Sequence, residues 1–183
     1  MNNHSLTNQR PLVNKLFLAG IIFIVFVLVF TIFQEANAES ENHLKKVAAK
    51  RMQFWNTGSL ALVEDVFTPD YKLHLVGRAD PEVVGTESLI EIVNFYNTAY
   101  PDMNYVADEV MISGDRVIMR LNFTGTNTGP RGDMPPTGKI VNSKALVISQ
   151  FKNVKISEEW VYVNRASVYR QLGYKLIPPS AQK

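Results

Sequence analysis

The chain has 183 residues, a formal net charge of +2 and no cysteine. The lack of cysteine excludes disulfides, thiol catalysis, cysteine metal sites and a lipoprotein anchor. A nearly neutral chain also has no large basic surface that would recruit nucleic acid, so we expect no nucleic-acid partner.

An apolar segment comes first along the chain. Residues 16–33, LFLAGIIFIVFVLVFTIF, carry no charge, and Arg10 and Lys15 precede them. The run is longer than most signal-peptide apolar regions and just long enough to span ~30 Å of hydrocarbon. The small residues of 36–38 favour cleavage before Glu39, and an uncleaved anchor with its positive end inside is the alternative. Both interpretations predict an exported periplasmic or extracellular domain, and the second adds membrane attachment through residues 16–33.

The segment also sets the expected domain boundaries. Residues 1–38 are the signal peptide or membrane anchor, and residues 39–183 form one domain that is large enough to bury a core. The core of this domain is expected over residues 44–173. We find no internal repeat and no sign of a second folded domain in the sequence.

Three helices are predicted before Pro101. The first starts at Leu44, and a short second one follows Ser59. The third is capped by Thr86 and stops before the proline, which disfavours helix at the residue preceding it. The apolar face of the first helix has helical spacing and consists of Leu44, Val47, Ala48, Met52 and Trp55.

Runs with alternating apolar and polar residues predict the strands. They lie at about 71–76, 104–112, 116–127, 139–152 and 155–164, with a short helix over 166–172 after them. This order indicates an α+β domain in which a curved antiparallel sheet curls around the N-terminal helices. A sheet curled in this way leaves a pocket at its open end.

Strand alternation predicts which side chains face that pocket. In the run 116–127, Asn127 is in line with a face that is otherwise apolar. In the last strand, one face carries aromatic rings together with hydrogen-bonding groups: Ile156, Glu158, Trp160, Tyr162 and Asn164. Such a mixture is typical of a cavity wall that holds an amphiphilic ligand.

Short motifs follow one another in order between Tyr100 and Gly173. They are Pro101-Asp102, Gly114 to Val117, Gly125 to Gly129, Pro135 to Gly138, Lys155 to Trp160 and Gln171 to Gly173. In order and spacing, this run resembles the SnoaL-like polyketide cyclase or ester cyclase family, within the nuclear-transport-factor-2-like group. The resemblance implies a cone-shaped α+β barrel with a hydrophobic pocket for a small hydrophobic molecule, often paired into a homodimer through the outer face of the sheet.

The resemblance also implies a reaction. Family enzymes are understood to close a polyketide ring by an intramolecular aldol condensation, with a carboxylate in the apolar pocket as the base. In this chain Val161 and Asn164 stand where the family has aspartates, and Asn127 stands at the family histidine. Asparagine cannot exchange a proton near neutral pH. The domain is therefore either a cyclase-type enzyme with a different base or a ligand-binding module that has lost catalysis.

His74 and Glu158 are the candidate catalytic residues. An unperturbed histidine titrates at a pKa of about 6.5, and Glu158 shares a predicted strand face with Trp160. The alternatives are a half-exposed strand histidine and a rim glutamate paired with a basic residue. The candidate ligand-binding residues are Asn127, Trp160, Tyr162 and Asn164. Of these, the two asparagines and Tyr162 would orient the carbonyl oxygen. The three histidines have no metal-ligand spacing, so we expect no metal and no other cofactor.

Overall fold

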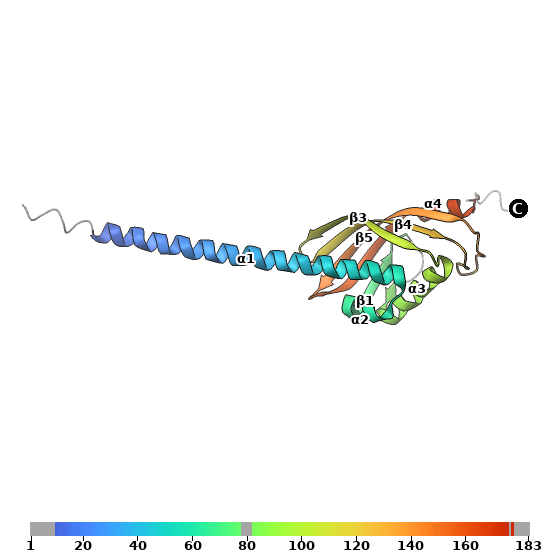
Figure 1. The fold of residues 1–183 in the computed structure, drawn as a ribbon, viewed down its shortest axis with the longest axis horizontal. Helices are drawn as coiled ribbons and strands as arrows, with labels where there is room; N and C mark the ends of the chain where they lie inside the picture. Colours follow the sequence, from blue (N-terminus) through green and yellow to red (C-terminus); the bar gives the residue numbers. More distant parts are fainter. Residues whose placement is uncertain (1–9, 78–81, 176, 178–183) are drawn as a thin grey trace, which may run out of the picture. The chain divides into compact units, whose positions relative to one another are not determined.

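The computed structural model of the chain describes residues 10–77, 82–175 and 177, and it divides the chain into two units, 1–42 and 43–183 (Figure 1). Helix α1 spans Arg10–Thr57 and contributes to both units. In the first unit, every side chain of the apolar run 16–33 is exposed. By length and composition this helix can cross a membrane, and a signal sequence passes the same test.

The second unit contains the remaining elements. They are η1 (Leu60–Leu62), α2 (Val63–Val66), β1 (Phe67–Leu75), β2 (Val83–Val84), α3 (Gly85–Ala99), β3 (Asn104–Ser113), β4 (Arg116–Thr126), β5 (Ile140–Lys152), β6 (Lys155–Val163) and α4 (Arg165–Leu172). The four long strands predicted after residue 103 are confirmed to within one residue at each end. Helix α4 ends at Gly173, whose left-handed φ of 94° favours glycine.

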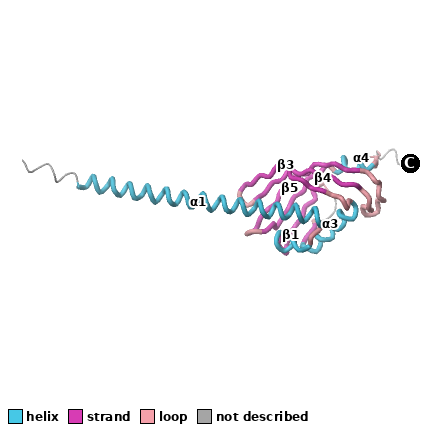
Figure 2. Tube along the Cα trace, in the orientation of Figure 1, coloured by secondary structure: helices cyan, strands magenta, loops and turns pink. Residues whose placement is uncertain are grey.

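The strands form one open, six-stranded sheet in the order β2-β1-β6-β5-β4-β3 (Figure 2). Neighbouring strands pair antiparallel except β1 and β6, which are parallel. The sheet is therefore mixed, whereas the sequence predicts an antiparallel sheet. Strands this far apart in sequence are not joined by a hairpin, and their relative direction therefore depends on the tertiary fold. The predicted α+β class with a curved sheet is confirmed.

The core lies between one face of this sheet and the helices that cover it (Figure 1). The C-terminal part of α1 packs its apolar face there, with Phe54 fully buried and Trp55 nearly so. Helix α3 contributes Leu89 and Val93, which are four residues apart and therefore lie on one helix face. Burial of these side chains provides the main favourable term for folding, because the chain has no disulfide.

Strand β4 shows the predicted alternation along its whole length. Its inward side chains are buried, and its outward ones are partly or fully exposed. The buried set is Val117, Met119, Leu121, Phe123, Gly125 and, just beyond the strand, Asn127. This alternation sets which side chains of β4 reach the interior.

Candidate ligand-binding site

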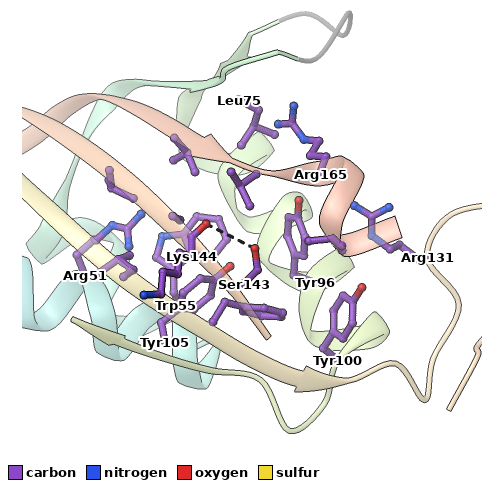
Figure 3. A pocket seen from close by; sticks show the side chains of 17 residues that line it. Arg51, Trp55, Leu75, Tyr96, Tyr100, Tyr105, Arg131, Ser143, Lys144 and Arg165 are labelled. Atoms are coloured by element: carbon purple, nitrogen blue, oxygen red, sulfur yellow. Dashed lines mark hydrogen bonds between the residues drawn. The ribbon is translucent and has the colours of Figure 1, made fainter. Parts of the chain in front are cut away.

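A cavity opens between the inner face of the sheet and helices α1, α3 and α4 (Figure 3). It has about 800 Å³ of space free of atoms when its open mouth is included. Aromatic side chains line much of it: Trp55, Tyr96, Tyr100, Tyr105 and Phe123. Aliphatic side chains line most of the remaining wall: Leu75, Leu121, Ala145, Val147, Val161, Val163 and Val168. A mainly apolar recess of this kind suits a small organic molecule.

The inward face of β6 differs from the predicted one because the strand contains a bulge. Gln150 of β5 pairs with Glu158 and Phe151 pairs with Ile156, so Ser157 is an extra residue in β6. One extra residue moves all later side chains to the opposite face. Val161 and Val163 therefore line the cavity. Glu158, Trp160 and Tyr162 lie on the opposite face of β6, which we call the alternate face, and do not line the cavity.

The structure brings three of the predicted site residues together on that alternate face. His74 Nε2 lies 2.6 Å from Glu158 Oε1, and the imidazole stacks on Trp160 with the ring centroids 5.2 Å apart. His74 Nδ1 lies 2.9 Å from Glu82 Oε1. All of these side chains are about one-third exposed or less, and none of them lines the cavity.

His74, Glu82, Glu158 and Trp160 form a group that we call the His74 cluster. Three of its side chains can ligate a metal. The ligand atoms of His74, Glu82 and Glu158 lie within 4.8 Å of one another. The two carboxylates, however, are bound to different nitrogen atoms of the imidazole ring. A metal would need the nitrogen and both carboxylates to converge on one point, so the arrangement fits a hydrogen-bonded chain better.

The other predicted ligand-binding residues do not line the cavity. Asn127 is buried, and its amide donates to the carbonyls of Ala99 and Gly129 and accepts from the backbone and hydroxyl of Thr137. Asn164 caps α4 by accepting from the Ser167 amide. Tyr162 is 43% exposed on the outer face of β6. The side-chain amide of Asn127 thus fixes the loop that follows β4, and its nitrogen and oxygen atoms already have partners within the protein.

A buried ion pair lies at one edge of the cavity. Arg51 of α1 lines the cavity and donates from Nε to Glu159 Oε1 at 3.0 Å and from Nη2 to Oε2 at 3.4 Å. Tyr71 donates to Oε2 at 2.7 Å, and Ser149 also donates to Oε1. Arg51 is 2% exposed and Glu159 is fully buried. The carboxylate therefore has all of its partners within the protein, and it does not line the cavity.

Among the buried polar atoms of the cavity lining, three have no hydrogen-bond partner within the described part of the chain and are available to a ligand. They are the indole nitrogen of Trp55, the hydroxyl of Tyr100 and Nε of Arg131. Burial raises the pKa of Tyr100 and of Tyr105, although the charge of Arg131 opposes the increase at Tyr100. The Tyr100 hydroxyl therefore stays protonated at neutral pH and can donate a hydrogen bond to a ligand.

Asp102 ties the turn after α3 to the end of β4. Thr126 donates to Asp102 from its backbone and from its hydroxyl, each at 2.6 Å. These bonds to Thr126 lower the pKa of Asp102. A lowered folded-state pKa means that the stabilisation is present above the unfolded pKa of about 3.9 and is lost as the pH falls through the folded value.

We therefore expect Asp102→Ala to reduce the free energy of unfolding near neutral pH, and to reduce it by less at about pH 2. Urea unfolding of the full chain in lipid nanodiscs, followed by tryptophan fluorescence, measures both differences. Asp102→Asn keeps the size of the side chain and separates loss of charge from loss of packing. An equal deficit at both pH values would contradict this role for the charge.

Sequence reasoning missed Arg51, Glu159 and Arg131 as parts of the cavity and its edge. Arg51 carried a usable signal, because it lies seven residues after Leu44 and therefore falls on the apolar face of the helix. Glu159 lies on the same face of β6 as Val161 and Val163. The prediction places the opposite face of the strand at the cavity, because alternation from Ile156 takes no account of the extra residue at Ser157. No local pattern marks Arg131, which lies in a loop rich in glycine and proline.

Comparisons with known proteins agree with this architecture. A family model described as SnoaL-like polyketide cyclase matches residues 45–172. This match confirms the resemblance seen in the motifs. No curated protein sequence matches the chain.

Several solved structures are similar in fold. A proposed polyketide cyclase from Bacillus cereus ATCC 10987 is 27% identical with a TM-score of 0.60, and the match covers 72% of this chain and 80% of that one. IdmH, a proposed polyketide cyclase from Streptomyces antibioticus, is 24% identical with a TM-score of 0.63 and coverage of 72% and 99%. A proposed SnoaL-like cyclase from Jannaschia sp. CCS1 is 17% identical with a TM-score of 0.67 and coverage of 74% and 94%.

Proposed function

The chain belongs to the SnoaL-like polyketide cyclase family, and we propose that its domain binds a small hydrophobic or amphiphilic carbonyl compound in the cavity. One observation carries this proposal. The apolar wall contains buried hydrogen-bond donors, at Tyr100 and Trp55, that have no partner among the described residues. An unpaired buried donor costs about 1–3 kcal/mol, and a ligand carbonyl oxygen would satisfy it.

The composition of the wall favours binding over proton transfer. No histidine, aspartate or glutamate lines the cavity within the described residues. At the positions where the resemblance implies such groups, this chain has Val161, Asn164 and Asn127. A carbonyl ligand could be held and polarised by tyrosine and arginine donors without a base beside it.

The experiment that tests this proposal fills the cavity from β5. Ala145→Phe places a ring in the lining, and Leu146→Phe is the matched control because Leu146 is 38% exposed on the opposite face. We expect Ala145→Phe to weaken binding of the probe 2-acetylnaphthalene by more than about tenfold, while Leu146→Phe leaves it unchanged. Equilibrium dialysis of the full chain in lipid nanodiscs, against empty nanodiscs, measures the affinity. Equal binding by both variants would refute the cavity as the binding site.

A second candidate function is catalysis at the His74 cluster. The short contact between His74 and Glu158, with Trp160 stacked on the ring, favours it because a carboxylate orients an imidazole for proton transfer. Turnover of a carbonyl substrate that falls in His74→Ala and Glu158→Gln, with folding intact, would support this candidate. Wild-type turnover in both variants would remove these residues from any mechanism.

We also propose that the domain acts outside the cytoplasm. The exposed apolar helix of residues 16–33 supports this placement, and it serves equally as a cleaved signal peptide or an uncleaved anchor. The intact mass of the protein from its native cells separates the two: a chain that begins at Glu39 has been cleaved. Light scattering of the purified protein tests the homodimer that we propose through the outer face of the sheet, where Val106 and Met111 of β3 are exposed.

A further inference from the structure

The charged side chains that line the cavity are all basic. The lining includes Lys144 and arginines 51, 131 and 165, and no acidic residue lines it within the described part of the chain. The charge of Arg51 is balanced by the buried carboxylate of Glu159. The cavity wall therefore holds positive charge that its own lining does not neutralise, and this favours a ligand with negative charge.

Arg131 is the arginine best placed to meet such a ligand. Its Nη1 donates to the Tyr169 hydroxyl at 3.1 Å, and its guanidinium lies 5.1 Å from the centroid of that ring. Nε is buried without a partner, and no carboxylate of the described residues lies within 4.0 Å of the guanidinium nitrogens. A partly buried cation that is bound only by a phenol and a ring retains donors for an anion.

The backbone around Arg131 holds the side chain at the cavity. Arg131 and Met134 exchange two backbone hydrogen bonds, at 2.9 Å and 3.3 Å, which close a tight turn. The amide of Asn127 fixes the same loop at Gly129 and Thr137. A loop held at both ends loses little entropy when a ligand binds, so the guanidinium is pre-organised.

Tyr100 offers a second donor on the same side of the cavity as Arg131 (Figure 3). The residue is 1% exposed, and its hydroxyl has no partner among the described residues. The charge of Arg131 opposes the rise in the Tyr100 pKa that burial causes. Because both side chains line the same side of the cavity, they can donate to the same anionic group.

We propose that the ligand is a monocarboxylate with a flat apolar body, and that Arg131 and Tyr100 bind its carboxylate. The body would lie against Trp55, Tyr105 and Phe123. This inference rests on the proposed function, because it names the chemical class of the carbonyl compound in the same cavity. The guanidinium of Arg131 and the neutral hydroxyl of Tyr100 together match a single negative charge, and a guanidinium fits the planar carboxylate through paired N–H donors.

A matched pair of probes tests the inference. 2-Naphthoate and 2-acetylnaphthalene share the same ring system and differ in the charge of the carbonyl group. We expect the full chain in lipid nanodiscs, measured by equilibrium dialysis against empty nanodiscs, to prefer 2-naphthoate by at least about tenfold, as charge-assisted hydrogen bonds suggest.

Four variants test the residues that would carry this preference. Arg131→Met should abolish it, Arg131→Lys should keep part of it, and Tyr100→Phe should reduce it a few-fold. Arg116→Met is the control, because Arg116 is exposed on β4 and bound to Gln150, and it should keep the full preference.

The possible outcomes separate the two proposals. Equal or tighter binding of 2-acetylnaphthalene by the wild-type chain would overturn the carboxylate inference and leave the proposed function standing. A preference for 2-naphthoate that persists in Arg131→Met would also overturn the inference, because the charge would then be bound elsewhere. If neither probe binds, the proposed function fails and the inference fails with it.

Discussion

Glu159→Ala is expected to lower the free energy of unfolding by about 3–5 kcal/mol, because it leaves Arg51 buried without a counter-charge. The same substitution removes the acceptor of the Tyr71 and Ser149 hydroxyls, both buried in the core. Urea unfolding of the full chain in lipid nanodiscs, followed by tryptophan fluorescence, measures the loss.

The neighbouring glutamate is the matched control for this prediction. Glu158 lies on the alternate face, with its side chain 32% exposed, and Glu158→Ala should cost less than about 1 kcal/mol. Replacing both partners, as Arg51→Met with Glu159→Leu, should cost less than Glu159→Ala alone, since no charge is then left unpaired. A loss below about 1 kcal/mol for Glu159→Ala would show that the ion pair is not buried as described.

Gly129→Ala is expected to destabilise the domain by about 3 kcal/mol, because the new methyl group would collide with the backbone. A Cβ at this position would lie 1.9 Å from the carbonyl oxygen of Thr98 and 2.8 Å from its carbon. Backbone cannot rotate away as a side chain can. The loop would therefore have to move, with loss of the Asn127 bond to the Gly129 carbonyl.

This movement would also displace Arg131, two residues further along the loop. We expect Gly129→Ala to weaken 2-naphthoate binding even at temperatures where the domain stays folded. Thr128→Ala is the control, because Thr128 is exposed and its replacement needs no backbone movement. Thermal unfolding followed by circular dichroism, together with equilibrium dialysis, gives both readouts. Unchanged stability in Gly129→Ala would mean that the loop does not approach Thr98 so closely.

The sequence was sufficient to predict the fold because its strands follow regular alternation and its helices have apolar faces. Strand β4 illustrates this, since every inward side chain from Val117 to Phe123 is buried as predicted. The parallel pairing of β1 with β6 was not predictable in the same way. It joins segments far apart in the chain, and only the tertiary fold sets their direction.

The site was harder to predict because it depends on one irregularity in a strand. The extra residue at Ser157 reverses the faces of β6, so that Glu159 and Val161 point inward. A bulge has no reliable sequence signal, and simple counting from Ile156 places Trp160 inward instead. Arg131 comes to the cavity from a loop, and its position depends on contacts with Asn127 and Met134 that no local pattern reveals.

The two tryptophans allow the most direct test of binding in the cavity. Trp55 lines the cavity, and Trp160 stacks on His74 on the alternate face of β6. The measurement is a titration of the ¹⁵N-labelled full chain in lipid nanodiscs with 2-acetylnaphthalene, which follows the two indole N–H signals by NMR. Trp55→Phe and Trp160→Phe assign these signals. We predict that the Trp55 signal shifts and the Trp160 signal stays in place. A shift of Trp160 alone, or of neither signal at saturating probe, would contradict binding in the cavity.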